Sequence, residues 1–572
     1  MKKILYILTI IITGISFNSC EDDLLEKTPL DGISDADFWK TESDLALYLN
    51  QLYGNFAGWP GAGAAPSYDI GTDIIVPHSQ WFGASSTNRL DGKTSIPSSG
   101  GGWSWTNVRR ANYFLENAER VESGNLLDHY IGEGHFFRAW FYFELFKSFG
   151  DLPIITEVVA TEDEDILYGA RSPRTEVANF ILSELDLAIE KMEPASQVGP
   201  SRLNKDVAAQ FKARVALYEG TWEKYHQGTD FGGSTDGTGF LQQAADAALS
   251  VIEDGRYSLY QGTSTDEAYY DLSVQTDYSS NPEVMLYKHY DYLTYNIQNS
   301  LWNQPNLQGM SREMTQFYLA SDGEPIAVST LFNGDETLDL IETNRDPRLA
   351  QTLMAPGDLD IIALDGSESY FTLPDMDRCP TGYSIEKWRS KEIDESNLRT
   401  RDIGYILFRY AESLLIYAEA KAELGTLTQE DVNLTINKLR GRVGMPDLNI
   451  NTITPDPNWP DYGYTIPDYL QEVRRERVVE LFGEGNRLYD LMRWRAHKLF
   501  VGKRPIGTTY TAELEAKFPN LVTNSEGFLD PLVNVLESGG GFGFNPDRDY
   551  LLPLPIDELT INEELHQNPN WD

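Results

Sequence analysis

Apolar residues recur at intervals of three and four along most of the chain, which is the spacing of one face of an α-helix. An early helix is predicted from about residue 35 to 56, with Thr41 or Ser43 as its N-cap. Another is predicted over 133–149, where Gly150 and Pro153 end it. The pattern thus indicates a mostly α protein. Further helices are predicted over 105–116, 175–192, 205–218, 240–253, 407–424, 429–442 and, as two helices, 469–494.

Alanines mark the faces on which these helices are expected to meet. Small side chains allow two helices to approach closely, and antiparallel helix pairs with alanine at their crossings are typical of tetratricopeptide-like repeats. The predicted contacts are between Ala208, Ala209, Ala213 and Ala216 on one helix and Ala244, Ala245, Ala247 and Ala248 on the next. A similar group of alanines recurs later in the chain, at Ala418, Ala420 and Ala422.

The periodicity changes between about residues 257 and 401, where Tyr, Asp, Gly, Pro and Asn separate short apolar runs. This composition predicts loops, short strands and small helices inserted between scaffold helices. We expect a single unit over 35–572, in which a tetratricopeptide-like helix-pair scaffold carries long loop-rich insertions that form the binding side. Its predicted parts are scaffold helices at about 35–256 and 402–500, the insertion at about 257–401, and a C-terminal segment at about 501–572.

Residues 469–494 combine helical periodicity with an unusual density of charge. Acidic and basic residues alternate so closely around apolar ones that some must be buried and paired. A catalytic constellation of carboxylates is the alternative, but an ion-pair network that fixes how two helices meet is the favoured interpretation. The charged residues are Arg474, Arg475, Glu476, Arg477, Glu480, Glu484, Arg487, Asp490 and Arg493.

The N-terminus has the features of an export signal. Met1, Lys2 and Lys3 precede an apolar run over 4–17 that is short for a membrane span. A small residue and then Cys20 close the run, which predicts a lipoprotein signal peptide over 1–19, lipidation of Cys20 and a tether over 20–34. An ordinary signal peptide in which Cys20 is incidental is the alternative.

The balance of charge argues against some classes of ligand. The chain has 46 Lys and Arg against 88 Asp and Glu, for a formal net charge of −42. Nucleic acid is excluded as a partner because its binding needs a basic surface, and strongly anionic polysaccharides are disfavoured for the same reason. If Cys20 carries lipid, only Cys379 remains as a thiol, so no intrachain disulfide is expected.

A search of the sequence for catalytic and metal-binding motifs finds no complete one. The chain has no Gly-x-Ser-x-Gly, no Gly-x-x-x-x-Gly-Lys-Ser/Thr and no His-Glu-x-x-His sequence. Asp547 and Asp549 imitate the start of a calcium loop, but Tyr550 stands where such a loop turns on Gly, so a capped turn is predicted. Asp230 and Asp236 are read as parts of a solvated loop. We expect no catalytic residue, no metal and no cofactor. A secreted α/α-type glycoside hydrolase is the enzymatic alternative.

Binding of a sugar is better supported, because aromatic residues gather in irregular, Gly- and Pro-rich segments. A pyranose stacks its C–H face on a flat aromatic ring while polar side chains bind its hydroxyls. The alternative is that these aromatics belong to the core. The candidate residues are Asp73, Trp81, Phe82, Asn88 and Arg89 in a first cluster, Tyr290, Tyr292, Trp302, Asn303 and Gln304 in a second, and Trp388 as a third, weaker candidate.

Several motifs together resemble those of one bacterial family. Arg-Arg-Glu-Arg at 474–477 is followed by Glu-Gly-x-Arg-x-x-Asp-Leu-x-Arg-Trp at 484–494, and Phe-Arg-Ala-Trp-Phe-Tyr-Phe-x-Leu starts at Phe137. A third motif, Phe-Arg-Tyr-Ala-Glu-Ser-Leu-Leu, starts at Phe408, and Gln-Asn-Pro stands at 567–569. In order and spacing these segments resemble the SusD/RagB family of outer-membrane nutrient-binding lipoproteins.

The resemblance implies a helical fold, no catalysis, and a partnership with a SusC-like TonB-dependent outer-membrane transporter. In the family, the sugar platform lies on loops before the second scaffold helix and in the middle insertion, which matches the regions of the two main clusters. We therefore expect an outer-membrane lipoprotein that faces outward from the cell and binds an oligo- or polysaccharide, a neutral one more readily than an anionic one. RagB-like peptide binding and uptake is the alternative.

Overall fold

The computed structural model describes residues 38–59, 69–78, 89–290, 308–392, 403–536 and 540–571. It confirms the prediction of a mostly helical protein. Within these residues, no helix is both long enough and apolar enough to cross a membrane.

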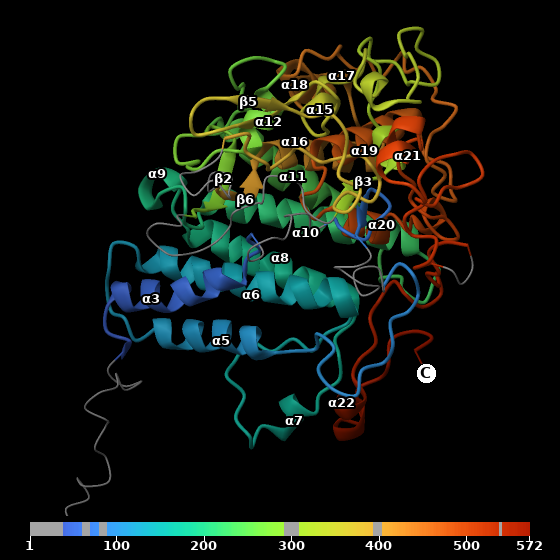
Figure 1. Ribbon diagram of the computed structural model, residues 1–572. Helices are drawn as coiled ribbons and strands as arrows, with labels where there is room; N and C mark the ends of the chain where they lie inside the picture. The colour runs from blue at the N-terminus through green and yellow to red at the C-terminus, as the bar shows by residue number, and fades with distance from the viewer. Residues whose placement is uncertain are drawn as a thin grey trace, which may run out of the picture.

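The N-terminal helices lie in layers at one end of the molecule (Figure 1). The longest helix, α6, packs against α3 and α5 on one side and α8 on the other. Phe136, Phe137, Phe143 and Phe146 of α6 are all buried, so this helix forms the centre of the main core. The bounds are α3 Glu42–Leu52, a short 3-10 helix η2 Tyr53–Asn55, α5 Thr106–Ala118, α6 Leu127–Phe149, α7 Glu164–Leu167 and α8 Arg174–Lys191.

The scaffold continues through helices that pack in succession, α10 against α8 and α11, and α11 against α16. Ala208, Ala213 and Ala216 of α10 and Ala244 and Ala248 of α11 are fully buried, as the alanine pattern predicts. These helices follow the N-terminal layers toward the far end of the molecule in Figure 1. Their bounds are α9 Ala195–Val198, α10 Lys205–His226, α11 Thr238–Asp254, α16 Tyr410–Glu423, α17 Gln429–Leu434 and α18 Ile436–Arg442.

Local hydrogen bonds explain where helices start. Thr41 caps α3, and the side chain of Asp44 accepts from the backbone N–H of Thr41 at 2.8 Å, which completes a capping box. Asn204 caps α10, because its buried Oδ1 accepts from the backbone N–H groups of Asp206 and Val207 at 3.1 and 3.2 Å. The first of these caps is one that the sequence predicts.

Two helix predictions are wrong in detail. The predicted helix over 407–424 begins as strand β6 (Tyr405–Arg409) and becomes helical only at Tyr410. The predicted helix over 429–442 is broken at Thr435, whose φ of −121° and ψ of −88° lie outside the helical region. At β6, pairing with β2 outweighs the helical spacing of the apolar residues.

The middle of the chain is loop-rich, with small helices and short antiparallel strand pairs that lie in the upper half of the view in Figure 1, on the same side as α16, α17 and α18. Strand β2 pairs with β6, so the insertion is joined by a two-stranded sheet to the strand that leads into α16. The other pairs are β1 with β3 and β4 with β5. The bounds are β1 Ile75–Pro77, β2 Val284–Lys288, β3 Gln308–Met310, β4 Leu359–Ile362, β5 Glu368–Tyr370, α12 Ala268–Ser273, α14 Arg312–Thr315, η4 Leu338–Leu340 and α15 Pro347–Ala350.

The C-terminal part returns to the N-terminal helices. Asn568 donates through Nδ2 to the backbone carbonyls of Phe149 at 3.1 Å and Leu552 at 2.7 Å, which holds the end of the chain against the end of α6. The remaining elements are α19 Asp468–Glu480, α20 Arg487–Arg493, η5 His497–Leu499, α21 Ala512–Lys517 and α22 Ile556–Ile561.

The charged segment 469–494 forms the two predicted helices, α19 and α20, and its charges are paired. Glu480 is fully buried and meets Arg409 at 2.7 Å, Arg442 at 2.7 Å and Arg348 at 3.2 Å. Burial alone would raise the pKa of Glu480, but the three arginines outweigh it and hold that pKa well below its usual range. The ion-pair interpretation of this segment is confirmed. We call residues 469–494 the brace.

The brace also joins its own two helices. Arg477 on α19 donates through Nε to Asp490 on α20 at 2.8 Å, and Arg493 donates through Nε to the other oxygen of Asp490 at 2.9 Å. Arg493 reaches Glu419 on α16 at 2.6 Å. All four side chains are buried. The position of α20 against the scaffold is therefore fixed by charge-assisted hydrogen bonds.

Candidate ligand-binding site

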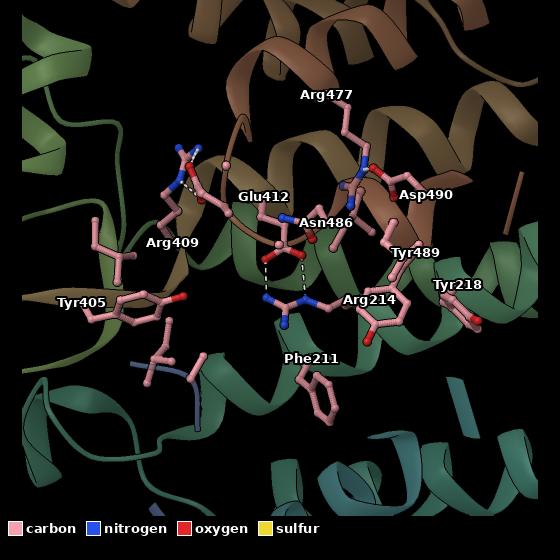
Figure 2. A pocket seen from close by; sticks show the side chains of 18 of the residues that line it. Phe211, Arg214, Tyr218, Tyr405, Arg409, Glu412, Arg477, Asn486, Tyr489 and Asp490 are labelled. Carbon is pink, nitrogen blue, oxygen red and sulfur yellow. Dashed lines mark hydrogen bonds and ion pairs between the residues drawn. The ribbon is translucent and has the colours of Figure 1, made fainter. Parts of the chain in front are cut away.

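A cavity of about 460 Å³ lies between α6, α10, strand β6 with α16, and the turn from α19 to α20. Figure 2 shows side chains from these elements pointing toward one another across it. Among its described lining residues only Asn55, Ala57 and Glu144 are exposed. They stand after α3 and on α6, and every other described lining residue is buried or half-buried. The volume falls in the usual range for a small-ligand site.

Aromatic side chains supply much of the lining. Trp140, Tyr405 and Tyr489 are half-buried, whereas Phe143, Phe211, Tyr218 and Trp388 are more deeply covered. Half-buried rings near an opening keep part of their surface available to a ligand while the rest is held by packing. Tyr405 is fixed in this way, because its ring meets the ring of Trp59 edge to face at 4.8 Å.

The charged lining residues are paired with one another. Arg214 on α10 holds Glu412 on α16 by two hydrogen bonds of 2.7 and 2.6 Å (Figure 2). Glu484 accepts from Arg409 at 2.8 and 2.9 Å. Lys387 donates to the same carboxylate at 2.7 Å. The cavity thus presents hydrogen-bonding groups whose charges are already balanced.

A further pair lies at the exposed side. Lys147 on α6 meets Glu144 at 2.9 Å, and its ammonium stands 3.9 Å from the centre of the Tyr489 ring. Burial alone would lower the pKa of Lys147, but Glu144 and its other neighbours outweigh it, so that pKa is raised and the ammonium stays charged. One face of Tyr489 is therefore covered by a cation.

Ionisation of the carboxylates follows from these contacts. Burial would raise the pKa of Glu484, but Arg409 and Lys387 hold it below its usual range. The same competition, with Arg477 and Arg493 as partners, lowers the pKa of Asp490. Asp69, behind the turn, differs, because burial raises its pKa to about 7 despite hydrogen bonds from the backbone of Arg487 and Gly485. Glu484 and Asp490 are thus acceptors that stay ionised at neutral pH.

The most buried part of the cavity contains hydrogen-bonding atoms without partners. The hydroxyl of Tyr218 and Nη1 of Arg477 have no hydrogen-bond partner among the described residues, although both side chains are only 3% exposed. A buried donor without a partner costs about 1–3 kcal/mol. A water molecule or a ligand in the cavity would supply the partners that these atoms lack.

Two of the predicted site residues come together beside this cavity. Trp388 lines it directly, although only 8% of its surface is exposed. Tyr290 packs into the same small apolar cluster, which also contains Trp59, Ile403 and Tyr405. Its hydroxyl accepts a hydrogen bond of 3.0 Å from the backbone N–H of Trp59. Candidates from two separate stretches of sequence thus support one end of the cavity.

Two other predicted residues have structural partners instead. Asp73 is buried and holds Arg487 of the brace through both carboxylate oxygens, at 2.8 and 2.5 Å. Arg89 donates to the backbone carbonyls of Asp549 at 3.3 Å and Tyr550 at 2.6 Å, which ties its segment to the C-terminal part. Neither lines the cavity.

The remaining predicted positions lie outside the described residues. They are Trp81, Phe82, Asn88, Tyr292, Trp302, Asn303, Gln304 and the lipidation site Cys20. Their assignment stays a prediction. Among the residues that the structure describes, no group of three or more His, Cys, Asp or Glu side chains could hold a metal ion.

Sequence reasoning missed several cavity residues. Arg477, Glu484, Asn486, Tyr489 and Asp490 all belong to the brace and line the cavity. The turn containing Gly483 and Gly485 marks where the two charged helices separate, but its sequence carries no sign of a cavity. Arg214, Glu412 and Tyr405 carry no local signal, since each stands within an ordinary amphipathic pattern.

Comparison with known proteins identifies the family. The family model described as the SusD family matches residues 256–571, and one described as starch-binding associating with outer membrane matches residues 102–217. The chain belongs to the SusD family. Its resemblance to SusD/RagB sequences, stated from the motifs alone, is confirmed.

Named relatives agree in length as well as in sequence. SusD-like protein P38 of Formosa agariphila is 26% identical over 510 residues, which cover 86% of this chain and 91% of that protein. SusD-like protein P2 of the same organism is 25% identical over 592 residues, covering 99% of each chain.

Solved structures share the fold. A SusD-like carbohydrate binding protein from Bacteroides fragilis matches with a TM-score of 0.71 at 21% identity, over 92% of this chain and 100% of that chain. A laminarin binding SusD-like protein matches with a TM-score of 0.55 at 20% identity, over 93% of this chain and 100% of that chain. At these identities the likeness establishes the fold.

Proposed function

We propose that this protein binds a neutral oligo- or polysaccharide without altering it and delivers it to a SusC-like TonB-dependent transporter in the outer membrane. The observation that carries the glycan part is the cavity, in which half-buried aromatic rings stand beside charges that are already paired. Aromatic faces suit the C–H surface of a sugar, and paired charges offer donors and acceptors without favouring a ligand of either sign.

Known relatives support the same ligand class. Similar structures include a carbohydrate binding protein and a laminarin binding protein, and one matching family model is described as starch-binding. For this chain we propose a neutral glycan, because Arg214, Arg409, Lys387 and Lys147 each face a carboxylate within the lining. An anionic ligand would have to displace one of these pairs.

The attachment to the membrane is proposed from the sequence. Lipidation of Cys20 would tether the protein through the segment that precedes α3. The family resemblance supports a position on the outward face, where a transporter could receive the glycan. Metabolic labelling with a palmitate analogue tests the anchor. Native protein should take up label and C20A should not, and equal labelling of both would contradict the proposal.

Glycan binding is tested by calorimetry with neutral and anionic polysaccharides, including laminarin and starch, beside a mixture of peptides. Native protein should bind at least one neutral glycan and no peptide. Tyr405→Ala and Trp388→Ala should weaken that binding by roughly 3- to 10-fold through loss of ring contact. Trp81→Ala and Trp302→Ala test the loop positions predicted from sequence.

The matched control is Tyr370→Ala, because Tyr370 on β5 is 55% exposed and does not line the cavity. It should bind as the native protein does. Binding to peptides alone would favour the RagB-like alternative, and release of reducing ends during incubation would favour a hydrolase. Failure to bind any glycan would contradict the proposed function.

A further inference from the structure

We infer that the cavity receives the end of a glycan chain, inserted lengthwise, and that Tyr218, Arg477 and Asn486 bind the hydroxyls of the terminal sugar. This inference rests on the proposed function. It adds the part of the polymer that is recognised: a free chain end rather than a stretch from the middle of a chain.

The distribution of exposure makes the cavity a blind one. The exposed lining residues Asn55, Ala57 and Glu144 all come from the side of η2 and α6. The lining residues that come from α10, α16 and α20 are all buried or half-buried, and Leu217, Ile416 and Arg493 among them are each at most 2% exposed. A ligand can therefore enter from one side of the described lining and finds buried helix surface at the other. The middle of a polymer needs a groove that is open at both ends, whereas a blind pocket admits an end.

The buried part of the cavity supplies the hydrogen-bonding groups that such an end requires. The Tyr218 hydroxyl and Arg477 Nη1 have no partner among the described residues. The side-chain amide of Asn486 is half-buried on the same lining and offers both a donor and an acceptor. Figure 2 shows Asn486 between Arg477 and Arg214, with Tyr489 and Tyr218 to one side. Polar groups from α10, α19 and the α19–α20 turn thus line the same cavity.

A terminal sugar differs from an internal one in a way that suits these groups. Where an internal unit carries a glycosidic oxygen bonded to its neighbour, a terminal unit carries a free hydroxyl, which both donates and accepts. Arg477 can only donate, while the Tyr218 hydroxyl and the Asn486 amide can do either. The position of Arg477 is set in advance, because its Nε is held by Asp490 at 2.8 Å. Such pre-positioning lowers the entropic cost of binding.

The size of the cavity is consistent with insertion of the end of a glycan chain. A volume of about 460 Å³ lies within the roughly 300–1,000 Å³ typical of small-ligand sites. It therefore suits a short piece of a glycan chain and not a long segment. The rest of the chain would lie at the opening, beside Trp140 and Tyr405.

The first test varies the number of chain ends at constant mass. A neutral polysaccharide that binds, such as laminarin or starch, is partly depolymerised in steps, and each preparation is titrated by calorimetry at equal mass concentration. If the protein recognises chain ends, the number of binding sites per gram of glycan should rise in proportion to the number of chain ends. If the number of binding sites per gram of glycan stays constant or falls, the inference is wrong, although glycan binding itself is unaffected. No binding to any preparation would instead contradict the proposed function.

The second test removes single polar groups. Tyr218→Phe and Asn486→Ala should each weaken binding of the depolymerised glycan by roughly 3- to 10-fold, the effect of one hydrogen bond. Tyr318→Phe is the matched control, because its hydroxyl is also buried but belongs to a different core cluster and does not line the cavity. It should bind as native protein does. If Tyr218→Phe and Asn486→Ala both bind normally, the assignment of the closed end is wrong.

Discussion

The indole ring of Trp388 lies directly against the backbone of Gly483. A Cβ atom on Gly483 would stand 2.5 Å from Cη2 of Trp388 and 2.6 Å from Cζ3, closer than any side chain tolerates. Both residues have left-handed backbones, with φ of 65° at Trp388 and 74° at Gly483. The turn between the two helices of the brace and the aromatic wall of the cavity are thus fitted to each other.

Gly483→Ala should therefore disturb both the fold and the cavity. The substitution strains a positive φ and pushes the Trp388 ring from its position, so we expect a loss of stability of about 1–3 kcal/mol. Glycan affinity should fall with it. Urea unfolding and calorimetry measure the two effects.

Gly502→Ala is the matched control for that experiment. Gly502 has a φ of 71° but no atom within 4 Å of the position of a Cβ, so it reports the backbone strain alone. It should lose less stability and keep glycan affinity. Equal effects of the two variants would show that the contact with Trp388 is unimportant.

Glu480→Gln should destabilise the protein by about 3–5 kcal/mol, because it removes the charge that three buried arginines share and leaves them without full compensation. Chemical denaturation measures the change. Glu513→Gln, on an exposed position of α21, should shift the free energy of unfolding by less than about 0.5 kcal/mol. A Glu480 variant as stable as the Glu513 variant would mean that the brace adds nothing to the fold.

Glu342→Gln should stabilise the protein at alkaline pH. Burial raises the pKa of Glu342 to about 9, with Asp358 and Glu386 reinforcing the effect, and Oε1 has no partner. A carboxyl with a raised pKa in the folded state binds its proton more tightly there than when unfolded, so stability falls as pH rises from about 4.5 to about 9. The amide cannot ionise.

The difference in melting temperature between E342Q and the native protein isolates this residue from other groups that titrate. It should grow by a few degrees from pH 5 to pH 9, in favour of the variant. A difference that does not change with pH would refute the explanation.

Asn204→Ala should cost about 1–2 kcal/mol, since it leaves the backbone N–H groups of Asp206 and Val207 without their acceptor at the start of α10. Asn204→Ser keeps an oxygen at the same position and should restore most of the loss. Thermal unfolding compares the three proteins. If serine is no better than alanine, the cap does not explain the role of Asn204.

The helical part of the fold could be predicted because its signals are local. Thr41 with Asp44, the buried alanines of α10 and α11, and the apolar period of α6 each act within a few residues or one helix contact. Strand β6, Tyr405 to Arg409, could not be predicted in this way. These residues form a strand only by pairing with β2, which lies more than a hundred residues earlier.

The candidate site was harder to predict, since it is assembled from residues that look ordinary in sequence. Trp388 and Tyr290 stood out as aromatics in irregular segments. Arg214 and Glu412 belong to helices separated by nearly two hundred positions, and only tertiary structure brings their side chains to 2.6 Å. The brace was correctly interpreted as a network of ion pairs, but nothing in its spacing indicated that one side of it borders a cavity.

Because Arg477, Glu484, Asp490 and Arg493 both hold the fold together and line the cavity, this wall has little freedom to change. A substitution there that suited a different sugar would also unpair a buried charge. New ligand preferences must therefore arise at half-buried positions such as Trp140, Tyr405 and Tyr489, or in the loops around the opening. Anyone redesigning this protein for another glycan should leave the charged wall unaltered and vary the rim.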